Sequence, residues 1–408
     1  MKILFIAHYF QPEPGFFFGL PFAEELTRRG QQVEILTGFP NYPEGKIYPE
    51  YRQRWRQIEV INGIRITRVP LYPSHDRSPL KRIISYTSLS CSQALVGLFC
   101  RFQADVAYVC QGPATIGLPA LLFKYRKKIP FIYHIQDLWP DSLNATGMFH
   151  STSGIKLLHY WCREIYRRAG HIVVITPGMK QILIERGVPA DRITLIYNWC
   201  DEQHLLADET LKDDFTQKLL APEYFNILYA GNIGTAQRLD TVIQAAELLR
   251  QEKKIRFILV GDGIAKNELE EQVREKRLEN VLFHPRVSLE AAGKLLQASN
   301  VVLTHLRRDP LFDITIPSKI QAYLASGKPI LAAIGHDAGM LVKTAGAGFS
   351  IEPEDPSAMA KAALTLSQMT PEELATMGKR GQEFYHRELA FSIGVSHFER
   401  LFETVRKK

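Results

Sequence analysis

The segment VVLTHLRRDPLFDITIPSKIQAYLASGKPILAAI, residues 301–334, contains in order a strand, a loop, a helix and a second strand. Residues 301–303 are β-branched and apolar, and the loop 306–317 is polar and interrupted by proline. Ser318 is predicted to cap a short helix, and Gly327 stands where a left-handed C-cap residue belongs. Residues 329–334 then resume as a buried strand, so the segment predicts a βαβ unit.

The start of this predicted helix is a candidate anion site. Ser318 and Lys319 stand beside free backbone N–H groups at the positive end of the helix dipole, and the ammonium adds a full charge. This combination suits a phosphate. The alternative on the pattern alone is an ordinary crossover whose lysine is merely solvated.

Composition restricts the class of protein. A chain of 408 residues predicts two domains, and 46% hydrophobic with 23% charged residues is typical of an ordinary globular protein. The formal charge of +7 favours anionic partners, but no Lys/Arg run alternates with aromatics, so we expect no nucleic-acid partner. The five cysteines are odd in number and include no CxxC pair, which favours reduced thiols in the cytoplasm.

Strands and helices alternate along both halves of the chain, which predicts parallel, doubly wound sheets. Residues 1–200 are expected to form one Rossmann-like domain, 201–223 a linker, and 224–385 a second Rossmann-like domain. Residues 371–405 are expected to be helical, and 386–408 to pack back towards the first domain. Two such domains would face each other across a cleft, which is a preferred place for ligands.

One apolar segment raises the question of a membrane. Residues 83–100 are eighteen uncharged residues, but six of them are polar, which is poor for a spanning helix. Arg77, Lys81 and Arg82 precede this segment. We therefore expect a buried or surface-lying helix, with reversible attachment to an anionic membrane surface as the functional interpretation. Residues 1–10 are predicted to be a first strand and not a signal peptide.

Six segments, in this order, carry a resemblance to a known family: KILFIAHYFQPE, LTGFPNYPEGKIY, HIQDLWPDS, LYAGNIGTAQRLD, LVGDG and PSKIQAYLASGKPIL. On them the chain resembles family 4 glycosyltransferases of the GT-B fold, from end to end. The likeness is greatest to the bacterial branch that builds O-antigen, capsule and exopolysaccharide, including N-acetyl-L-fucosamine transferases.

The resemblance implies retaining transfer of a sugar from a nucleoside diphosphate, expected to be UDP, to a lipid-linked saccharide at the inner face of the cell membrane. It implies no metal and no cofactor, and the chain contains no DxD pair. Protein groups must then stabilise the leaving diphosphate. The residues that the resemblance assigns to donor binding are Gly15, Gly231, Asn232, Gln237, Arg238, Gly261, Arg286, Ser318 and Lys319. Asp137 and His134 would face the reacting sugar.

This chain also departs from the family pattern. Asn232 and Gln237 occupy positions where many members have Arg and Lys, and Ala322 replaces a glutamate that usually holds ribose hydroxyls. Lys319, with Arg238 or Arg286, should therefore matter more. The departures keep two alternatives open: a binding or scaffold protein without turnover, and a sugar-nucleotide epimerase of the same fold. From the residues alone, His134 can be a packed strand histidine, and residues 261–263 can be only a turn.

Overall fold

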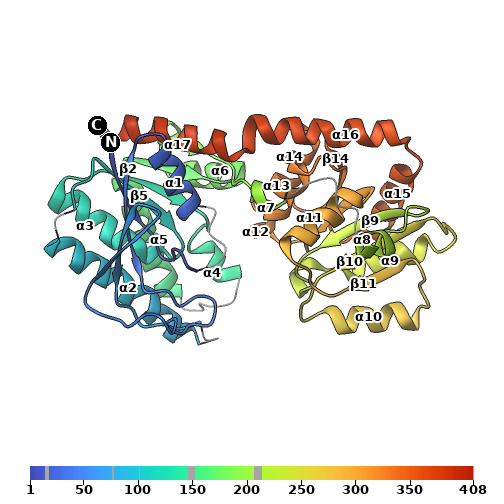
Figure 1. Ribbon diagram of the computed structural model, residues 1–408, viewed down its shortest axis with the longest axis horizontal. Helices are drawn as coiled ribbons and strands as arrows, with labels where there is room; N and C mark the ends of the chain where they lie inside the picture. The colour runs from blue at the N-terminus through green and yellow to red at the C-terminus, as the bar shows by residue number, and fades with distance from the viewer. Residues whose placement is uncertain (14–17, 76–77, 101, 146–151, 206–213, 408) are drawn as a thin grey trace. The chain divides into compact units, whose positions relative to one another are not determined.

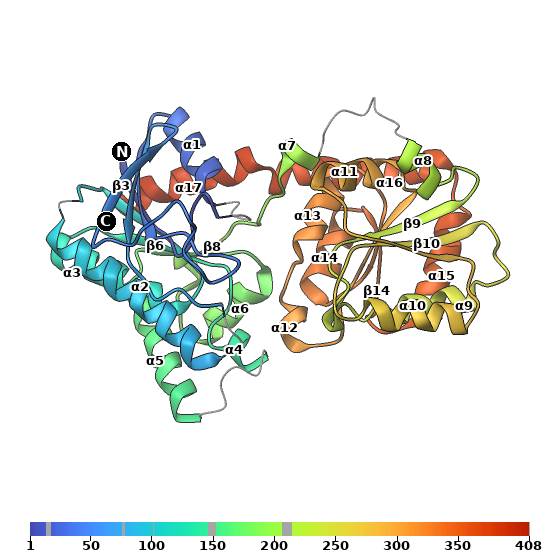
Figure 2. The ribbon, with the colours of Figure 1, turned by 60° about the horizontal axis from the view of Figure 1, so that its bottom comes forward.

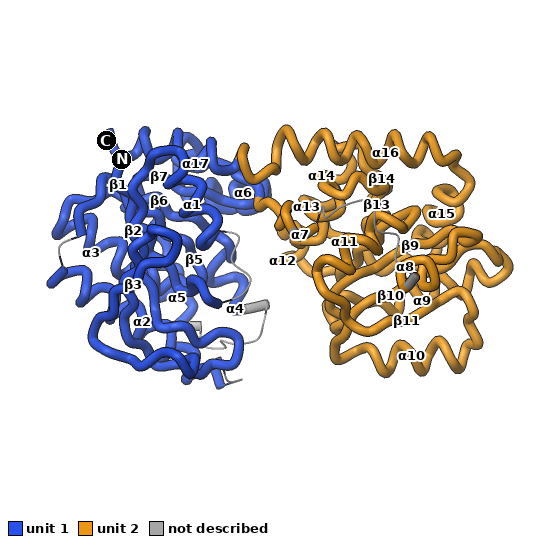
Figure 3. Tube along the Cα trace, viewed as in Figure 1, with its two compact units in different colours: residues 1–197, 394–408 blue, residues 198–393 orange. Residues whose placement is uncertain are grey.

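The computed structural model describes residues 1–13, 18–75, 78–100, 102–145, 152–205 and 214–407. The chain forms two compact units, shown in different colours in Figure 3. One consists of Met1–Tyr197 and Gly394–Lys408, and the other of Asn198–Ile393. Each unit has its own sheet, which gives the two-domain α/β architecture predicted from the alternating pattern.

The N-terminal unit contains an eight-stranded sheet in the order β3-β4-β2-β1-β5-β6-β7-β8. Its strands are β1 (Lys2–Ile6), β2 (Gln32–Gly38), β3 (Gln57–Ile61), β4 (Ile64–Val69), β5 (Val106–Gln111), β6 (Phe131–Ile135), β7 (His171–Val174) and β8 (Ile193–Leu195). The strand order reverses between β1 and β5. The loops that leave these two strands therefore diverge, as they do at the ligand sites of open α/β sheets.

Sequence reasoning missed the edge strand β3, which pairs antiparallel with β4. A two-residue turn joins them, with Asn62 at φ 51° and Gly63 at φ 81°. An Asn-Gly pair between two apolar runs is a strong hairpin signal, because both central positions of the turn need positive φ. The dipeptide was therefore a usable signal.

Helices cover both faces of this sheet. They are α1 (Leu20–Arg28), α2 (Pro79–Phe99), α3 (Gly117–Lys127), α4 (Asp141–Ala145), α5 (Thr152–Arg168) and α6 (Pro177–Glu185), with single 3₁₀ turns at Ala114–Ile116 and Ala190–Arg192. Phe22 of α1 packs on Phe5 and Tyr108 at one face, and Tyr166 of α5 packs on Tyr133 at the other.

The last helix, α17 (Phe391–Arg406), completes the core of the N-terminal unit. Phe398 is fully buried, and its ring centroid lies 5.2 Å from that of Phe22 and 5.4 Å from that of Tyr108. Arg29 adds an ion pair to Glu399 at 2.9 Å. The sheet therefore needs the C-terminal residues to cover one face.

The second unit contains a six-stranded parallel sheet in the order β11-β10-β9-β12-β13-β14. Its strands are β9 (Phe225–Ala230), β10 (Ile255–Val260), β11 (Val281–His284), β12 (Val301–His305), β13 (Ile330–Ala333) and β14 (Gly348–Ile351). The order reverses between β9 and β12, and this is the second switch point. The segment 301–334 does form the expected strand–helix–strand unit.

The helices of this unit are α7 (Glu202–Leu205), α8 (Asp214–Leu219), α9 (Asp240–Leu248), α10 (Lys266–Glu275), α11 (Leu289–Ala298), α12 (Pro310–Asp313), α13 (Ser318–Ala325), α14 (His336–Thr344), α15 (Pro356–Ser367) and α16 (Pro371–Phe384), with a 3₁₀ turn at Thr235–Gln237. Helix α9 packs on both α10 and α15 (labelled in Figure 1 and seen closer together in Figure 2), and the three helices share one hydrophobic core with the sheet. Helices α7 and α8 pack on α11, so the described part of the expected linker 201–223 contains elements of this unit.

The single helix expected over 371–405 is interrupted. A π-helical turn, Tyr385–Leu389, follows α16, and Ala390 then leaves helical geometry with ψ 146°. The Tyr385 hydroxyl donates to Glu202, and the N–H of Phe391 donates to the same carboxylate oxygen. This carboxylate therefore supplies an acceptor for the backbone donor that begins the next helix, an interaction between distant residues that periodicity does not reveal.

Replacing Phe398 tests whether the C-terminal helix is part of the first core. Phe398→Ala removes a fully buried ring and leaves a cavity, so we expect a loss of about 3–5 kcal/mol in the free energy of unfolding. Urea denaturation measures it. Arg400→Ala on the exposed face of the same helix is the control, with a change within about 0.5 kcal/mol. Equal effects of the two substitutions would contradict the packing described.

Candidate functional site

The switch point of the second sheet brings together the loop after β9 and the loop between β12 and α13. The backbone N–H of Arg307 donates to the carbonyl of Ala236 at 2.9 Å. His305, buried at the end of β12, bridges the same loops, since its Nδ1 donates to the carbonyl of Gln237 at 2.8 Å. Its Nε2 accepts from the N–H of Glu354 at 3.1 Å, and burial lowers the pKa of His305 to about 4. Sequence reasoning did not single out this neutral, bridging histidine.

Lys319 lies over this switch point from the first turn of α13. Its Nζ lies 3.5 Å from the ring centroid of Tyr229, the last-but-one residue of β9. Gly231 makes room for it, because a Cβ there would come within 2.5 Å of the Lys319 Cε. The glycine therefore holds open the path that the lysine takes across the end of β9.

The ammonium of Lys319 makes no hydrogen bond or ion pair with any of the described residues. Burial lowers the pKa of Lys319 to about 7, because the cation has lost water and gained no anion. The backbone N–H groups of Ser318 and Lys319 precede the first bond of the helix turn, Ile320 N–H to Pro317 O at 2.9 Å. A partnerless ammonium and free N–H groups thus stand together, as the sequence predicted.

One detail of that prediction is wrong. Helix α13 begins at Ser318 with Pro317 in the cap position, so Ser318 is the first helical residue and not the N-cap. The pyrrolidine ring fixes φ of Pro317 near −60°, and its extended ψ of 141° suits the entry to a helix. The Ser318 side chain is exposed. Gly327, with φ 69°, ends the helix in the left-handed region, as expected.

Three glycines bring the loops after β9 and β10 into direct backbone contact. Gly261 has φ 152°, and a Cβ there would lie 1.8 Å from the carbonyl oxygen of Gly231. Gly263 has φ 158°, and a Cβ there would lie 2.2 Å from the carbonyl oxygen of Ile233. Residues 261–263 thus form a close backbone contact and not a simple turn. This contact fixes the position of the loop after β9 against the loop after β10.

Asn232 and Gln237 hold the loop after β9 closed on itself. The Gln237 side-chain oxygen accepts from the Asn232 amide at 3.0 Å and from the N–H of Gly234 at 3.0 Å. At positions where many family members have cations, this chain therefore has a neutral hydrogen-bonded pair. Lys319 supplies the positive charge at this loop.

The two other candidate cations differ in their surroundings. Arg238, in the left-handed region at φ 42°, forms ion pairs with Asp240 at 2.9 Å and Glu354 at 3.3 Å. Arg286 is exposed, and its backbone N–H donates to Asp262 at 3.2 Å. Arg238 already has carboxylate partners, so of these two Arg286 has the more available charge; donor binding by either stays a prediction.

In the N-terminal unit, His134 lies in the sheet and not at its surface. It has no exposed area, and its ring lies 4.6 Å from Phe18 and 5.1 Å from Phe398 by centroids. Its Nδ1 is bonded to the Tyr108 hydroxyl at 2.7 Å and its Nε2 to the Gln136 amide at 2.9 Å. Burial lowers the pKa of His134 to about 3, so the ring is neutral. This geometry favours positioning of the loop after β6, and a catalytic role stays a prediction.

Asp137 occupies that loop, directly after β6. Its side chain is exposed, whereas its backbone carbonyl accepts from Gln111 at 2.9 Å. The surrounding protein removes enough water to raise the pKa of the Asp137 carboxyl. A carboxyl fixed through its backbone at the carboxyl end of a parallel strand can contact a substrate, which is the role predicted for it.

Gly15 lies outside the described residues, but its neighbour Glu13 reveals how the first loop is held. Glu13 is 1% exposed, and its carboxylate accepts from the N–H groups of Phe10, Asn41 and Tyr42 at 2.8–3.1 Å. Buried Arg68 lies nearby and donates to Gly38 O at 3.1 Å. The matching segments FQPE and FPNYPE are thus joined through one carboxylate, a coupling that sequence reasoning missed.

The described residues of both units lack the ligand sets that metal ions need. Within the described residues, no three His, Cys, Asp or Glu side chains come together in a way that could hold a metal ion.

Comparison with known proteins agrees with this architecture. A glycosyl transferase 4-like domain model matches residues 20–199, and a glycosyl transferases group 1 model matches residues 224–369. WcaI of Escherichia coli (strain K12), named for colanic acid biosynthesis, is 29% identical over 375 residues, which are 88% of this chain and 90% of its own. Alpha-monoglucosyldiacylglycerol synthase of Streptococcus pneumoniae is 22% identical over 369 residues, 84% of this chain and 79% of its own. The crystal structure of Anabaena HepE in complex with UDP has a TM-score of 0.69 at 16% identity, covering 99% of this chain and 100% of that chain.

The fold and the two switch-point loops define a glycosyltransferase of the GT-B class. The chain belongs to family 4 of these glycosyltransferases, which confirms the resemblance found in its six motifs. Its branch within the family stays a prediction.

The pKa of Lys319 gives a test of the site that needs no ligand. The unfolded chain keeps this proton to about pH 10.4, but the folded protein releases it near pH 7. Between these values the unfolded state binds more protons, so stability rises with pH. We expect Lys319→Met to melt higher than the wild type at about pH 6, and the difference to shrink towards about pH 10.

Differential scanning calorimetry of both proteins over this range measures the effect. Lys361→Met, at an exposed position of α15, is the matched control and should show no such trend. A constant difference between Lys319→Met and the wild type would mean that the ammonium of Lys319 is not desolvated in the folded protein.

Proposed function

We propose that this glycosyltransferase transfers a sugar, with retention, from a UDP-linked donor to a lipid-linked saccharide in polysaccharide biosynthesis. The observation that carries the proposal is Lys319: a partly buried ammonium that has no anionic partner among the described residues and stands beside the N–H groups of a helix N-terminus. A diphosphate supplies both the missing charge and the missing acceptors. The donor sugar is a hexose or an acetamido-deoxyhexose in this proposal.

The chemistry follows from where negative charge develops. As the bond between the sugar and the diphosphate breaks, the leaving diphosphate gains charge, and fixed donors stabilise that charge without reorganising. Lys319, the N–H groups of Ser318 and Lys319, and the loop after β9 are these donors. No metal or cofactor is assigned a role. Asp137 contacts the reacting sugar or orients the acceptor hydroxyl from the N-terminal unit.

The relatives support the donor and the acceptor chosen here. The HepE crystal structures contain UDP or UDP-glucose, and WcaI is named for colanic acid biosynthesis. The pneumococcal synthase is named for a glycosylated diacylglycerol, and thus for a lipid acceptor. A lipid-linked acceptor requires the enzyme to work at a membrane surface.

Helix α2 has the surface such a role requires, because apolar side chains lie exposed along it while its buried side mixes polar residues with Leu89, Ala94 and Val96. Its buried side includes Ser85, Ser90 and Gln93, and the fully buried Gln93 amide donates to the carbonyl of Ala7, directly after β1, and to that of Leu36 in β2. Its exposed side carries apolar side chains, namely Leu80, Ile83, Ile84, Leu95, Leu98 and Phe99. No helix in the described residues is long and apolar enough to cross a membrane. We propose that α2 lies on the cytoplasmic face of the cell membrane, with Lys81 and Arg82 near anionic head groups.

The same fold is compatible with two other functions. A scaffold without turnover is favoured by Ala322, Asn232 and Gln237, which remove groups that many family members use. A sugar-nucleotide epimerase would act on the donor alone. The ammonium of Lys319 serves all three functions, so turnover has to separate them.

Activity with radiolabelled UDP-sugars and a lipid-linked acceptor tests the proposal. We expect transfer that persists in EDTA, and a product with the anomeric configuration of the donor. Asp137→Asn should lower kcat by at least about tenfold with little change in the melting temperature. Asp191→Asn, at an exposed position of the same unit, is the control.

The outcomes separate the alternatives. UDP-sugar binding without any product would favour the scaffold, and an epimerised nucleotide sugar formed without acceptor would favour the epimerase. If Asp137→Asn kept full turnover but melted earlier, Asp137 would be a structural residue.

Vesicle co-sedimentation tests the membrane surface. The wild type should bind vesicles of phosphatidylcholine with phosphatidylglycerol, bind pure phosphatidylcholine weakly, and dissociate at high salt, because basic groups contribute about 1 kcal/mol each. Ile84→Gln with Leu95→Gln should abolish binding, as should Lys81→Glu with Arg82→Glu. Ile264→Gln, which is 84% exposed on the other unit, is the matched control. Equal binding of all variants would refute the assignment of α2.

A further inference from the structure

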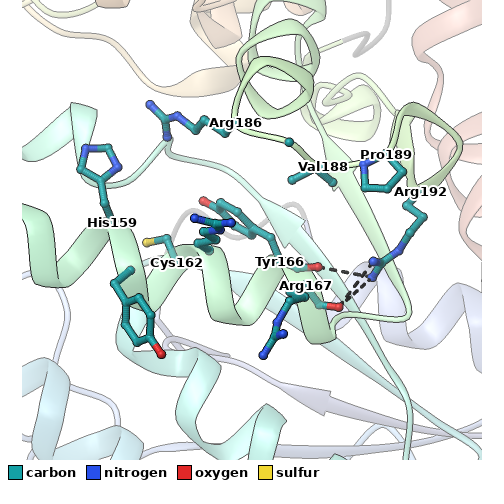
Figure 4. Close-up of a pocket in the computed structure, with 11 residues that line it drawn as sticks. His159, Cys162, Tyr166, Arg167, Arg186, Val188, Pro189 and Arg192 are labelled. Atoms are coloured by element: carbon teal, nitrogen blue, oxygen red, sulfur yellow. Dashed lines mark hydrogen bonds between the residues drawn. The ribbon is translucent and has the colours of Figure 1, made fainter.

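The N-terminal unit contains a pocket of about 590 Å³ between α5 and the loop that connects α6 to β8. This volume is typical of small-molecule sites and far exceeds that of a single ion. Figure 4 shows His159, Arg186 and Arg192 on different sides of the pocket, around Tyr166. The proposed transfer reaction uses none of these residues. We call this cavity the α5–α6 pocket.

Two buried polar atoms at the α5–α6 pocket have no hydrogen-bond partner of good geometry among the described residues. Tyr166 is 3% exposed, and its hydroxyl finds no hydrogen-bond partner of good geometry among the described residues. Its polar neighbour is the Cys162 thiol, a weak hydrogen-bonding group. The Nη1 of Arg186 is likewise buried and unsatisfied. Leaving such donors unpaired costs about 1–3 kcal/mol each. Both atoms belong to residues that line the pocket, which favours a ligand that offers acceptor oxygens.

The charges at the α5–α6 pocket are unbalanced. Among the described residues, no carboxylate lines it. Arg186 pairs with Asp141 at 2.6 Å, and Arg167 pairs with Glu164 at 2.9 Å, so these two charges are compensated. The other two arginines, Arg163 and Arg192, have no carboxylate partner in the described residues.

The guanidinium of Arg192 donates hydrogen bonds to backbone carbonyls, among them those of Tyr166 and Arg167 at 3.3–3.4 Å. Arg163 has neither a hydrogen bond nor an ion pair within the described residues, and its side chain is exposed. The positive charges of Arg163 and Arg192 are therefore not balanced by a carboxylate among the described residues, and together they match the charge of a dianion.

We propose that the α5–α6 pocket binds a phosphate-bearing ligand. A phosphate monoester offers two negative charges and several acceptor oxygens, which suit the fork of Arg163, the free Nη1 of Arg186 and the Tyr166 hydroxyl. Burial raises the pKa of Tyr166, so the hydroxyl keeps its proton and donates. The remaining volume holds the group to which the phosphate is attached.

The chemistry fits both a soluble phosphorylated compound and a phospholipid head group. Leu157 and Tyr160, which are 69% and 68% exposed, present an apolar surface on α5 one to two turns before Arg163. An apolar chain attached to the phosphate could lie there. The test therefore uses one probe of each source.

The probes are sodium phosphate and vesicles of phosphatidylcholine containing phosphatidic acid, with sodium chloride at equal ionic strength as the blank. The protein carries Lys319→Met, so that a phosphate at the other unit does not contribute. We expect phosphate, vesicles or both to bind, with Tyr166→Phe weakening the affinity about fivefold and Arg163→Gln about tenfold.

The controls are chosen to match the variants. Tyr133→Phe also removes a buried hydroxyl without a hydrogen bond, but from a residue that does not line the α5–α6 pocket. Arg126→Gln removes an exposed arginine of α3. Binding of phosphate alone would identify a soluble ligand, and pocket-dependent binding of vesicles alone would identify a head group.

Two results would overturn the proposal: neither probe binds, or Tyr166→Phe and Arg163→Gln bind as tightly as Tyr133→Phe and Arg126→Gln. Because the Lys319→Met background removes the donor site, failure here leaves the proposed transferase function untouched. Failure of the transferase assay leaves this binding test equally intact.

Discussion

The unpaired ammonium of Lys319 is the constraint on which the second unit's site depends. A partly buried cation without an anion is unfavourable, and its pKa falls towards 7 as a result. Three features of the fold maintain it: Gly231 leaves room for the side chain, the Tyr229 ring faces the ammonium, and His305 ties the neighbouring loops together. An anionic ligand would complete the arrangement. The fold therefore holds the ammonium of Lys319 in its binding position before the ligand binds.

The N-terminal unit has a buried charge of the opposite sign, the carboxylate of Glu13. Glu13 accepts three backbone N–H groups and lies near buried Arg68, and these contacts offset part of the burial that raises the pKa of its carboxyl. The result is a fixed loop after β1, at the switch point of the first sheet. Each unit thus has a charged side chain at the loop beside its switch point, satisfied internally in the first unit and left for a ligand in the second.

Local patterns predicted the alternating elements, the two units and Lys319 beside a helix N-terminus, because periodicity and helix signals depend on near neighbours in the sequence. They missed interactions that join distant residues. Glu202 satisfies a backbone donor at Phe391 and so interrupts the expected long helix. Gln93, in a segment judged by its hydropathy, is buried against β1 and β2 while apolar residues of α2 face outwards.

The same distinction between local patterns and interactions of distant residues applies to the candidate site residues. Gly231 and Gly261 were predicted from the family motif, but only the structure reveals that one packs on the other. The positions of His134 in the aromatic core and of Arg238 between two carboxylates depend on residues far away in the sequence. The sequence contains no signal that pairs Tyr166 with Arg186 across the α5–α6 pocket.

Proton uptake on nucleotide binding tests the central claim most directly. If UDP meets the ammonium of Lys319, binding raises its pKa, and the protein takes up close to one proton at about pH 8, where UDP itself is fully ionised. Isothermal titration calorimetry in two buffers of different ionisation enthalpy measures this number. The account predicts uptake by the wild type, none by Lys319→Met, and at least about tenfold weaker binding by that variant. Binding without proton uptake, or equal affinity of the two proteins, would contradict it.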